Sequence, residues 1–141
     1  HLAVTFHYYD PFEFTHHQAV WMKEKPTFNR TWGTPADLEK VARDFQDAKA
    51  IAQRLGAPLF LGEFGVNQQI PIAQRALWVE TVRRNAEAIG AGWCHFDFVS
   101  EFPLLNAARD RWLPAMVSAL LDEPASASRK PGPVPPWGGA R

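Results

Sequence analysis

Residues 59–65 read LFLGEFG, a short apolar run that is interrupted by a single carboxylate, Glu63. The run follows Ala57-Pro58 and is too short for an ordinary helix, so we interpret it as a strand that is buried on both faces. Gly62 allows a substrate or another backbone to come close to this strand. A carboxylate on a buried strand is costly unless it is paired or reaches solvent. Glu63 is therefore the leading candidate for a catalytic residue, and the alternative is a strand-end glutamate that simply contacts water.

Two helices flank this strand in the sequence. Thr34-Pro35 combines a hydroxyl N-cap with proline at the first helical position, and Gly56 ends the helix that starts there. A second helix covers about 72–89 and stops at the glycine that follows. We expect each helix to bury its apolar face. The apolar residues at helical spacing are Leu38, Val41, Phe45, Ala48, Ala52 and Leu55 in the first helix and Ala76, Leu77, Val79, Val82 and Ala86 in the second.

Strands alternate with these helices along the chain. Residues 2–9 (LAVTFHYY) and 91–98 predict two further strands, a long loop covers 12–33, and a last short helix covers 111–121. Strands and helices in this order connect through right-handed crossovers and form a parallel sheet. No glycine-rich phosphate-binding turn follows any of the strands. The predicted fold class is therefore α/β, as part of a barrel or as an open doubly wound sheet.

Polar and aromatic side chains gather at the carboxyl ends of the predicted strands. His7 and Tyr9 are two residues apart and therefore project to the same face of the first strand. They can orient a neighbouring carboxylate, although a His and a Tyr inside a layered core would show the same pattern. Glu63 ends the second strand, and His95 and Asp97 end the third. In a (β/α)8 barrel, the carboxyl ends of the strands carry the catalytic residues.

The composition argues against several classes of partner. The 141 residues include 15 Lys plus Arg and 15 Asp plus Glu, so no basic field attracts nucleic acid or an anionic membrane. No apolar run approaches the roughly 20 residues of a membrane-spanning helix, and the single cysteine, Cys94, cannot form an internal disulfide. The adjacent His16 and His17 lack further ligands at metal-binding spacing, so we expect no metal site. Six Trp and ten Phe fit either a large core or a sugar-binding surface.

We divide the chain after residue 122. Residues 1–122 contain all the predicted strands and helices, whereas residues 123–141 are rich in Pro, Gly, Ala and Ser and show no period. We therefore expect a globular domain followed by a tail or linker. The chain opens directly into a strand without a preceding turn or cap, so we also expect it to be part of a longer protein.

Five segments stand in a consistent order and at the spacing of barrel units. They are HYYDPFEFTH at 7–16, WG at 32–33, GEFG at 62–65, R-x-x-W at 75–78 and GWCHFDF at 92–98. Together they resemble the last three βα units of glycoside hydrolase family 5, the cellulases and endoglucanases, and the resemblance covers residues 2 to about 122. It implies a partial (β/α)8 TIM barrel that contributes strands six to eight.

The resemblance also implies a set of site residues. The sixth strand of the family carries an H-x-Y pair, which corresponds to His7 and Tyr9, and the seventh ends in the nucleophilic glutamate, which corresponds to Glu63. An aromatic residue at the end of the eighth strand forms a platform for the sugar and corresponds to Phe96, where relatives usually carry Trp. The substrate-binding residues predicted on this basis are Phe96, Trp93, Trp32 and His16.

The implied activity is that of a retaining endoglucanase that cleaves β-1,4-linked glucans, with mannanase and exo-β-glucosidase as neighbouring activities. Two carboxyl groups about 5–5.5 Å apart share the work in such an enzyme, one as nucleophile and one as acid/base. Tyr9 would donate a hydrogen bond to Glu63, and His7 would bond a sugar hydroxyl or the other carboxylate.

The family's acid/base glutamate follows an asparagine on the fourth strand, and no Asn-Glu pair occurs in this sequence. We therefore expect the acid/base to lie in a missing N-terminal half of the barrel, and the isolated chain to be inactive. The resemblance implies no cofactor. We expect the full-length parent to be secreted or periplasmic, although nothing in the chain itself fixes the compartment.

Two other interpretations stay open from the residues alone. A non-catalytic carbohydrate-binding protein could use Trp21, Trp32 and Phe96 as stacking surfaces. A small doubly wound α/β protein would leave Glu63 without a catalytic role. Both need a chain that is complete as given, whereas the hydrolase needs further barrel strands.

Overall fold

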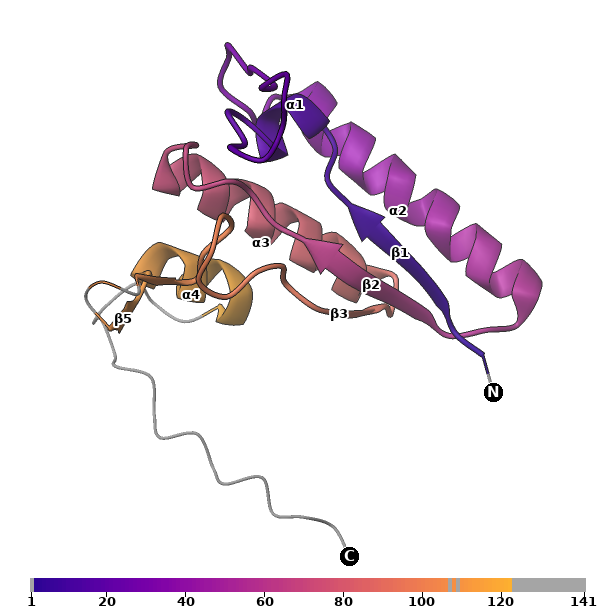
Figure 1. Cartoon of the computed structure of the whole chain (residues 1–141). Coiled ribbons are helices and arrows are strands. Elements are labelled where there is room, and N and C mark those ends of the chain that lie inside the picture. The colour runs from indigo at the N-terminus through magenta and orange to yellow at the C-terminus, as the bar shows by residue number, and fades with distance from the viewer. Residues whose placement is uncertain (1, 107, 109, 123–141) are drawn as a thin grey trace, which may run out of the picture.

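The computed structural model describes residues 2–106, 108 and 110–122, so the predicted tail at 123–141 lies outside the described residues. The predicted alternation of strands and helices is present (Figure 1). The elements in chain order are β1 (Val4–Tyr8), α1 (Phe12–Thr15), α2 (Pro35–Leu55), β2 (Leu59–Phe64), α3 (Ile72–Ala88), β3 (Gly92–Trp93), β4 (Leu105–Asn106), β5 (Arg111–Trp112) and α4 (Pro114–Leu121).

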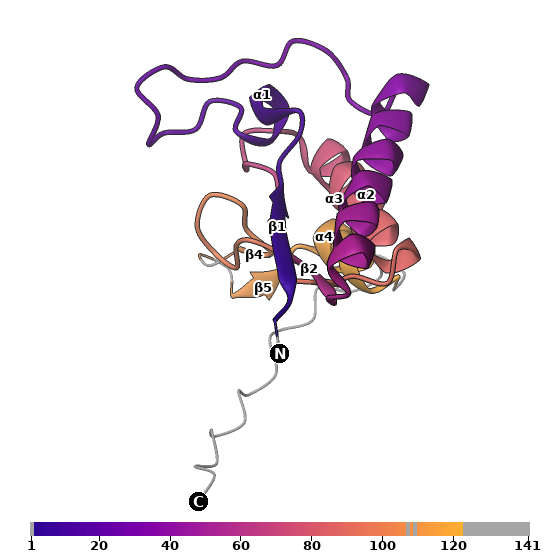
Figure 2. The same cartoon turned by 90° about the vertical axis from the view of Figure 1, so that its right-hand side faces the viewer.

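The first three strands form one parallel sheet in the order β1-β2-β3. α2 connects β1 to β2, α3 connects β2 to β3, and both helices lie on the same side of the sheet (Figure 2). Strands added in sequence order with their crossovers on one face build a barrel wall, whereas a doubly wound sheet carries helices on both faces. The arrangement therefore favours the barrel interpretation over the small doubly wound protein.

α2 begins and ends where its sequence predicts. The Thr34 side chain accepts a hydrogen bond from the backbone N–H of Asp37, and the Asp37 carboxylate accepts one from the Thr34 N–H. This capping box satisfies two of the free donors at the start of the helix. Pro35 occupies the first turn, and Gly56 ends the helix with a φ of 60°, a left-handed conformation that suits glycine.

The core lies between the sheet and the helices on its covered face. The prediction for α3 was wrong at Leu77, which is 39% exposed, because the helix buries the larger neighbouring ring of Trp78 instead. The Trp78 indole N–H donates to the Asp10 carbonyl at 3.1 Å and so also has its polar atom satisfied. The largest fully buried apolar side chains of α2, β2 and α3 are Val41, Phe45, Leu61, Phe64, Trp78, Val79 and Val82.

The ends of α2 also depart from the predicted buried face. Leu38 and Leu55 are exposed, although both continue the helical spacing. α2 has 21 residues and β2 has 6, which correspond to about 31 Å of helix and roughly 20 Å of strand. The two ends of the helix therefore project beyond the sheet that buries its middle.

Only one face of β2 is covered, so the prediction of a strand buried on both faces is wrong for this chain. Phe60 is 40% exposed, and its partners in register, Thr5 on β1 and Gly92 on β3, are exposed as well. None of the helices within residues 2–106, 108 and 110–122 packs on this side. We refer to it as the open face of the sheet.

The third strand is shorter than the predicted span of 91–98. Regular pairing covers only Gly92–Trp93. Two further hydrogen bonds extend the contact with β2, from the Cys94 N–H to the Leu61 carbonyl and from the Phe96 N–H to the Phe64 carbonyl, both at 2.9 Å. The chain beyond β3 therefore follows the edge of β2 without regular strand geometry.

Two smaller elements differ from the sequence prediction. The last helix starts at Pro114 rather than at residue 111, because proline has no N–H to donate and fits only the first turn. Residues 111–112 instead form β5, which pairs with β4 as an antiparallel hairpin. The predicted loop at 12–33 contains the short helix α1 at its start.

Gly65 follows β2 and lies directly against the backbone of the segment after β3. A Cβ at Gly65 would stand 1.9 Å from the Phe96 carbonyl oxygen and 3.3 Å from Cβ of Phe102. Rotation of a side chain cannot relieve the first contact, because the nearest atom belongs to the backbone. The close approach of the two segments therefore requires glycine.

We expect Gly65→Ala to lower the free energy of unfolding by roughly 1–3 kcal/mol, because the Phe96 backbone must move to admit the methyl group. Urea unfolding followed by circular dichroism measures the change. Gly92→Ala is the matched control, since a Cβ there meets the ring of Phe60 at 3.1 Å, and that exposed ring can turn aside. Equal losses in the two variants would contradict the close backbone contact.

Candidate active site

A β-bulge in β2 sets the direction of Glu63. Phe6 of β1 pairs with Leu61, but His7 pairs with Glu63, so Gly62 and Glu63 together stand opposite one residue of β1. In a regular strand Glu63 would point with Leu61 toward the helices. The extra residue shifts the alternation by one, so Glu63 shares the open face with His7. The Glu63 side chain is 37% exposed there.

Gly62 provides the space that this bulge needs. A Cβ at Gly62 would lie 3.0 Å from the Thr5 hydroxyl oxygen and 3.3 Å from two atoms of the His7 ring. Such distances are tighter than ordinary van der Waals contact, so a side chain there would push against both neighbours. Glycine therefore lets the side chains of β1 pack closely beside Glu63.

One oxygen of Glu63 has two polar neighbours. The Tyr9 hydroxyl donates to Glu63 Oε2 at 3.0 Å, and His7 Nδ1 lies 3.5 Å from the same oxygen. Burial raises the pKa of Tyr9 well above its usual range, and the hydrogen bond to the Glu63 carboxylate adds to this shift. Tyr9 therefore keeps its proton and stays a donor. Tyr9 makes the expected hydrogen bond, and His7 contacts Glu63 itself.

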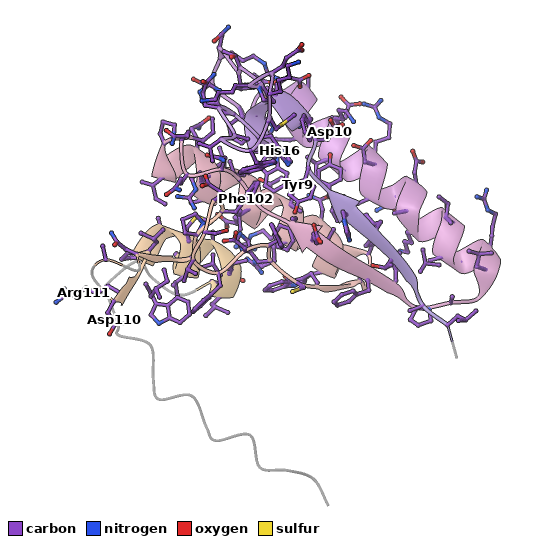
Figure 3. The ribbon with its side chains drawn as sticks, in the orientation of Figure 1. Tyr9, Asp10, His16, Phe102, Asp110 and Arg111 are labelled. Carbon is purple, nitrogen blue, oxygen red and sulfur yellow. The ribbon has the colours of Figure 1, made fainter. Side chains whose placement is uncertain are left out.

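Phe102 is the centre of an aromatic cluster beside Tyr9. Its side chain is 3% exposed. Figure 3 shows Tyr9 and His16 close to Phe102, above the carboxyl end of the sheet. The rings with centroids 5.5–6.0 Å from that of Phe102 are Tyr9, His16, Trp21 and Phe96. We call these five residues the Phe102 cluster. Phe102 was not predicted as a site residue, because a single Phe in an irregular segment carries no periodic signal.

Two of the predicted substrate-binding residues belong to this cluster. Phe96 is 42% exposed, so one part of its ring is open to a ligand. His16 stacks on Phe12 with ring centroids 4.0 Å apart and makes an edge contact with Tyr9 at 5.0 Å. Burial lowers the pKa of His16, which favours its neutral form. His16 therefore packs directly against Tyr9, which holds Glu63, whereas Phe96 is linked to Tyr9 through Phe102.

The other two predicted substrate-binding residues lie elsewhere. Trp32 is 2% exposed and stacks on Phe14 in the core, so neither face of its ring is free. Trp93 pairs in register with the buried Leu61 and therefore points toward the helices, where its indole N–H donates to Glu87 at 3.1 Å. The structure brings neither ring to Glu63, so the geometry gives no support to these two predictions.

Hydrogen bonds join the loops that follow the three parallel strands. The Asn67 N–H donates to the Thr15 carbonyl, and the Gln68 N–H donates to the Glu101 carbonyl, each at 2.8 Å. Asn67 is fully buried, and its side-chain oxygen accepts the Gln69 N–H at 2.9 Å. These contacts fix the loops at the carboxyl ends of β1, β2 and β3 against one another, on the side where a barrel carries its active site.

Two statements hold for the described ranges 2–106, 108 and 110–122. Within them, no three His, Cys, Asp or Glu side chains gather as ligands of a metal ion would. The helices in the same ranges include none that is both long enough and apolar enough to cross a bilayer.

The sequence matches the Cellulase family (glycosyl hydrolase family 5) over residues 1–99. The matched part covers well over half of the chain and contains the parallel sheet, Glu63 and Phe96. The chain belongs to glycosyl hydrolase family 5. The family that its motifs indicate is therefore confirmed.

Known members of the family resemble this chain in sequence and structure. Endoglucanase H of Acetivibrio thermocellus is 35% identical over 82 residues, which are 58% of this chain and 8% of that protein. A solved hyperthermophilic endo-β-1,4-glucanase in complex with substrate is 30% identical, with a TM-score of 0.81 over 86% of this chain and 39% of that chain. Thermotoga maritima Cel5A in complex with cellobiose is 30% identical, with a TM-score of 0.80 over 84% of this chain and 39% of that chain.

This chain therefore spans less than half of the length of each of these relatives. The solved structures are family 5 TIM-barrel endoglucanases, and the chain has the α/β arrangement of a part of them. The assignment of its strands to positions six to eight of the barrel stays a prediction.

In this family 5 chain, the charges of Arg75 and Asp97 both act on His95. His95 Nδ1 is 3.1 Å from the Asp97 carbonyl oxygen. Burial lowers the pKa of His95 to about 4; the bond to the Asp97 carbonyl and the Asp97 charge oppose this shift, and the positive charge of Arg75 adds to it. Arg75 is itself buried and donates from Nη2 to the Pro103 carbonyl at 2.7 Å. His95 is therefore neutral at physiological pH.

We expect His95 to titrate near pH 4, against an ordinary value of 6.5. As the pH falls below 6.5, the unfolded chain takes up this proton before the folded chain does, so His95 makes the fold progressively less stable down to about pH 4. NMR titration of the imidazole C–H resonances gives the midpoint, and urea unfolding between these pH values gives the loss of stability. A midpoint at or above 6.5 would contradict the buried neutral ring.

Proposed function

We propose that Glu63 is the nucleophile of a retaining glycoside hydrolase that cleaves β-1,4-linked glucans. The observation that carries this proposal is the pair of contacts to one carboxylate oxygen. Tyr9 and His7 both approach Oε2 of Glu63, so Oε1 is the oxygen that we assign to attack. The carboxylate stands at the carboxyl end of β2 on the open face, where a sugar can approach it.

The proposed reaction has two steps. In the first, Glu63 Oε1 attacks the anomeric carbon, a glycosyl ester forms, and the glycosidic bond breaks as an acid protonates the leaving oxygen. In the second, the same group acts as base, and water hydrolyses the ester so that Glu63 returns to its carboxylate form. Tyr9 keeps Oε2 hydrogen-bonded throughout, because its raised pKa keeps the phenol protonated.

The substrate that we propose follows from the relatives and from the exposed rings. One solved relative is an endo-β-1,4-glucanase with bound substrate, and Thermotoga maritima Cel5A has been solved with cellobiose and with mannotriose. Phe96 and His16 of the Phe102 cluster are the residues that we assign to sugar contact, since aromatic rings pack on the apolar faces of pyranoses. A β-1,4-glucan is our first choice of substrate, and a β-1,4-mannan is the second.

The acid/base must be a residue other than the two that contact Glu63. Among the described residues, the side chains bonded or ion-paired with Glu63 are those of Tyr9 and His7, and neither is a carboxylic acid. We propose that the other part of the same barrel, its N-terminal half, supplies the acid/base and covers the open face. Because the proposed substrate is a polymer, we also propose that the complete enzyme acts outside the cytoplasm.

We expect Glu63→Gln to abolish turnover in a protein that joins this chain to a complete barrel. The amide keeps the shape of the side chain and can still accept from Tyr9, but it cannot attack the anomeric carbon. The loss should be large, roughly 10⁴-fold or more, as for other residues that act as nucleophiles. Release of reducing sugar from a soluble β-glucan measures it.

Glu101→Gln is the matched control for this variant. Glu101 lies on the loop after β3 and bonds to Asn67 and Gln68 rather than to Tyr9, so this variant should keep its turnover. A 2-fluoro glycoside should esterify Glu63 alone in the unchanged protein. Peptide mapping that located the label on Glu101 or Asp97 would overturn the assignment.

We expect residues 1–141 on their own to release no reducing sugar from β-glucan. The reason is that, in the proposed mechanism, the acid that protonates the leaving oxygen comes from the other part of the barrel. The assay should use the chain at high concentration beside its Glu63→Gln variant. Activity that is present in the chain and lost in the variant would show that the acid/base lies within these residues.

A further inference from the structure

Two buried side-chain nitrogen atoms have no hydrogen-bond partner among the described residues. They are Nε of Arg75 and Nε2 of His95. Buried polar atoms in folded proteins are nearly always paired, so each such atom calls for an explanation. The positive charge of Arg75 lowers the pKa of His95, and the charge of Asp97 raises the pKa of both residues. The two residues are therefore linked through their charges.

The contact of His95 with Asp97 determines which tautomer the ring adopts. A carbonyl oxygen can only accept, so the 3.1 Å contact to the Asp97 carbonyl is a hydrogen bond only if His95 Nδ1 carries the proton. In the neutral ring, Nε2 is then an acceptor, and it has no hydrogen-bond partner among the described residues. A charged ring would instead place a second buried donor at Nε2 and a positive charge that the charge of Arg75 disfavours.

The segment that His95 bonds to is the one that carries Phe96. The Phe96 N–H donates to the Phe64 carbonyl at 2.9 Å, and the Phe96 carbonyl lies against Gly65, where even a methyl group would not fit. The His95 ring makes an edge contact with Phe64 at 5.4 Å. The bond from His95 to the Asp97 carbonyl joins the residues on either side of Phe96 and so restrains the backbone at Phe96.

We propose that His95, held as the neutral Nδ1–H tautomer by its bond to the Asp97 carbonyl, is a positioning residue that fixes the Phe96 segment against the end of β2. Its relevance to sugar binding rests on the proposed function, because Phe96 is the ring assigned to sugar contact. The alternative is that His95 merely fills space in the core, in which case any side chain of similar size would serve.

The positioning role and the space-filling role can be distinguished with three versions of residues 1–141. They are the unchanged chain, His95→Asn and His95→Leu. His95→Asn retains an N–H donor close to the position of Nδ1, whereas His95→Leu retains bulk without any donor. Amide hydrogen exchange by NMR reports on the segment directly. The amide of Cys94, which donates to the Leu61 carbonyl at 2.9 Å, is the internal control because its bond lies on the other side of His95.

We expect exchange at the Phe96 amide to speed up by about tenfold in His95→Leu, the size of effect that follows from losing one hydrogen bond that holds the segment. Exchange at Cys94 should be unchanged, and His95→Asn should restore protection at Phe96. The imidazole ¹⁵N shifts of the unchanged chain at pH 7 should show a protonated Nδ1 and an unprotonated Nε2.

Any of three results would overturn the proposal. They are a proton on Nε2 in the unchanged chain, equal Phe96 exchange in His95→Leu and His95→Asn, and a Phe96 amide that is unprotected even in the unchanged chain. None of these measurements uses a substrate. A result against the role of His95 would therefore not affect the assignment of Glu63. The exchange and shift measurements could also still be interpreted if the hydrolase assignment were wrong.

Discussion

The position of Glu63 depends on one extra residue in β2. Leu59 and Leu61 point to the helices, so regular alternation would send residue 63 into the same core, where an unpaired carboxylate is very unfavourable. The bulge at Gly62 places Glu63 on the open face and still returns Phe64 to the core, opposite Tyr8. A single local irregularity thus separates the charged residue from the apolar residues on either side of it.

The two glycines of the GEFG motif serve this arrangement in different ways. Gly62 makes room for side chains of β1, and Gly65 makes room for the backbone of the segment after β3. Between them, Glu63 accepts the hydrogen bond from Tyr9, and the strand that carries it packs against the Phe96 backbone at Gly65. The motif therefore needs glycine at both positions so that two neighbouring segments can pack closely against the strand. This close packing explains why a carboxylate on a short apolar strand can have a defined orientation.

Local sequence signals predicted the helices and strands well, but they could not predict contacts between segments that are distant in the sequence. The cap at Thr34-Pro35 and the stop at Gly56 act within one turn of the chain, so the sequence alone locates α2. In α3, by contrast, the prediction of Leu77 was an error of pattern: Trp78, Val79, Val82 and Ala86 share one stripe of the helix, and Leu77 lies off it. The bulge and the position of Phe102 arise from pairing across more than fifty and ninety residues respectively, which no periodicity encodes. Resemblance to the family located Glu63 and Tyr9, but it also placed Trp93 on the sugar side, where the register with Leu61 turns that ring to the helices.

The geometry at Glu63 separates the positioning of the proposed nucleophile from the other requirements of hydrolysis. The Tyr9 hydroxyl comes from the end of β1 and the bulge from β2, and Phe102 in the segment after β3 packs on the Tyr9 ring. Because Tyr9 stays protonated, its O–H continues to point at Oε2, and the free oxygen is always the same one. Everything needed to aim Glu63 therefore lies within about a hundred residues, on strands that are neighbours in the sheet. Under the proposed mechanism, a second carboxyl group about 5–5.5 Å away must approach from across the open face, which no described helix covers. The orientation of Glu63 is thus a local property of this chain, whereas the proposed hydrolysis would require the opposite wall of the barrel.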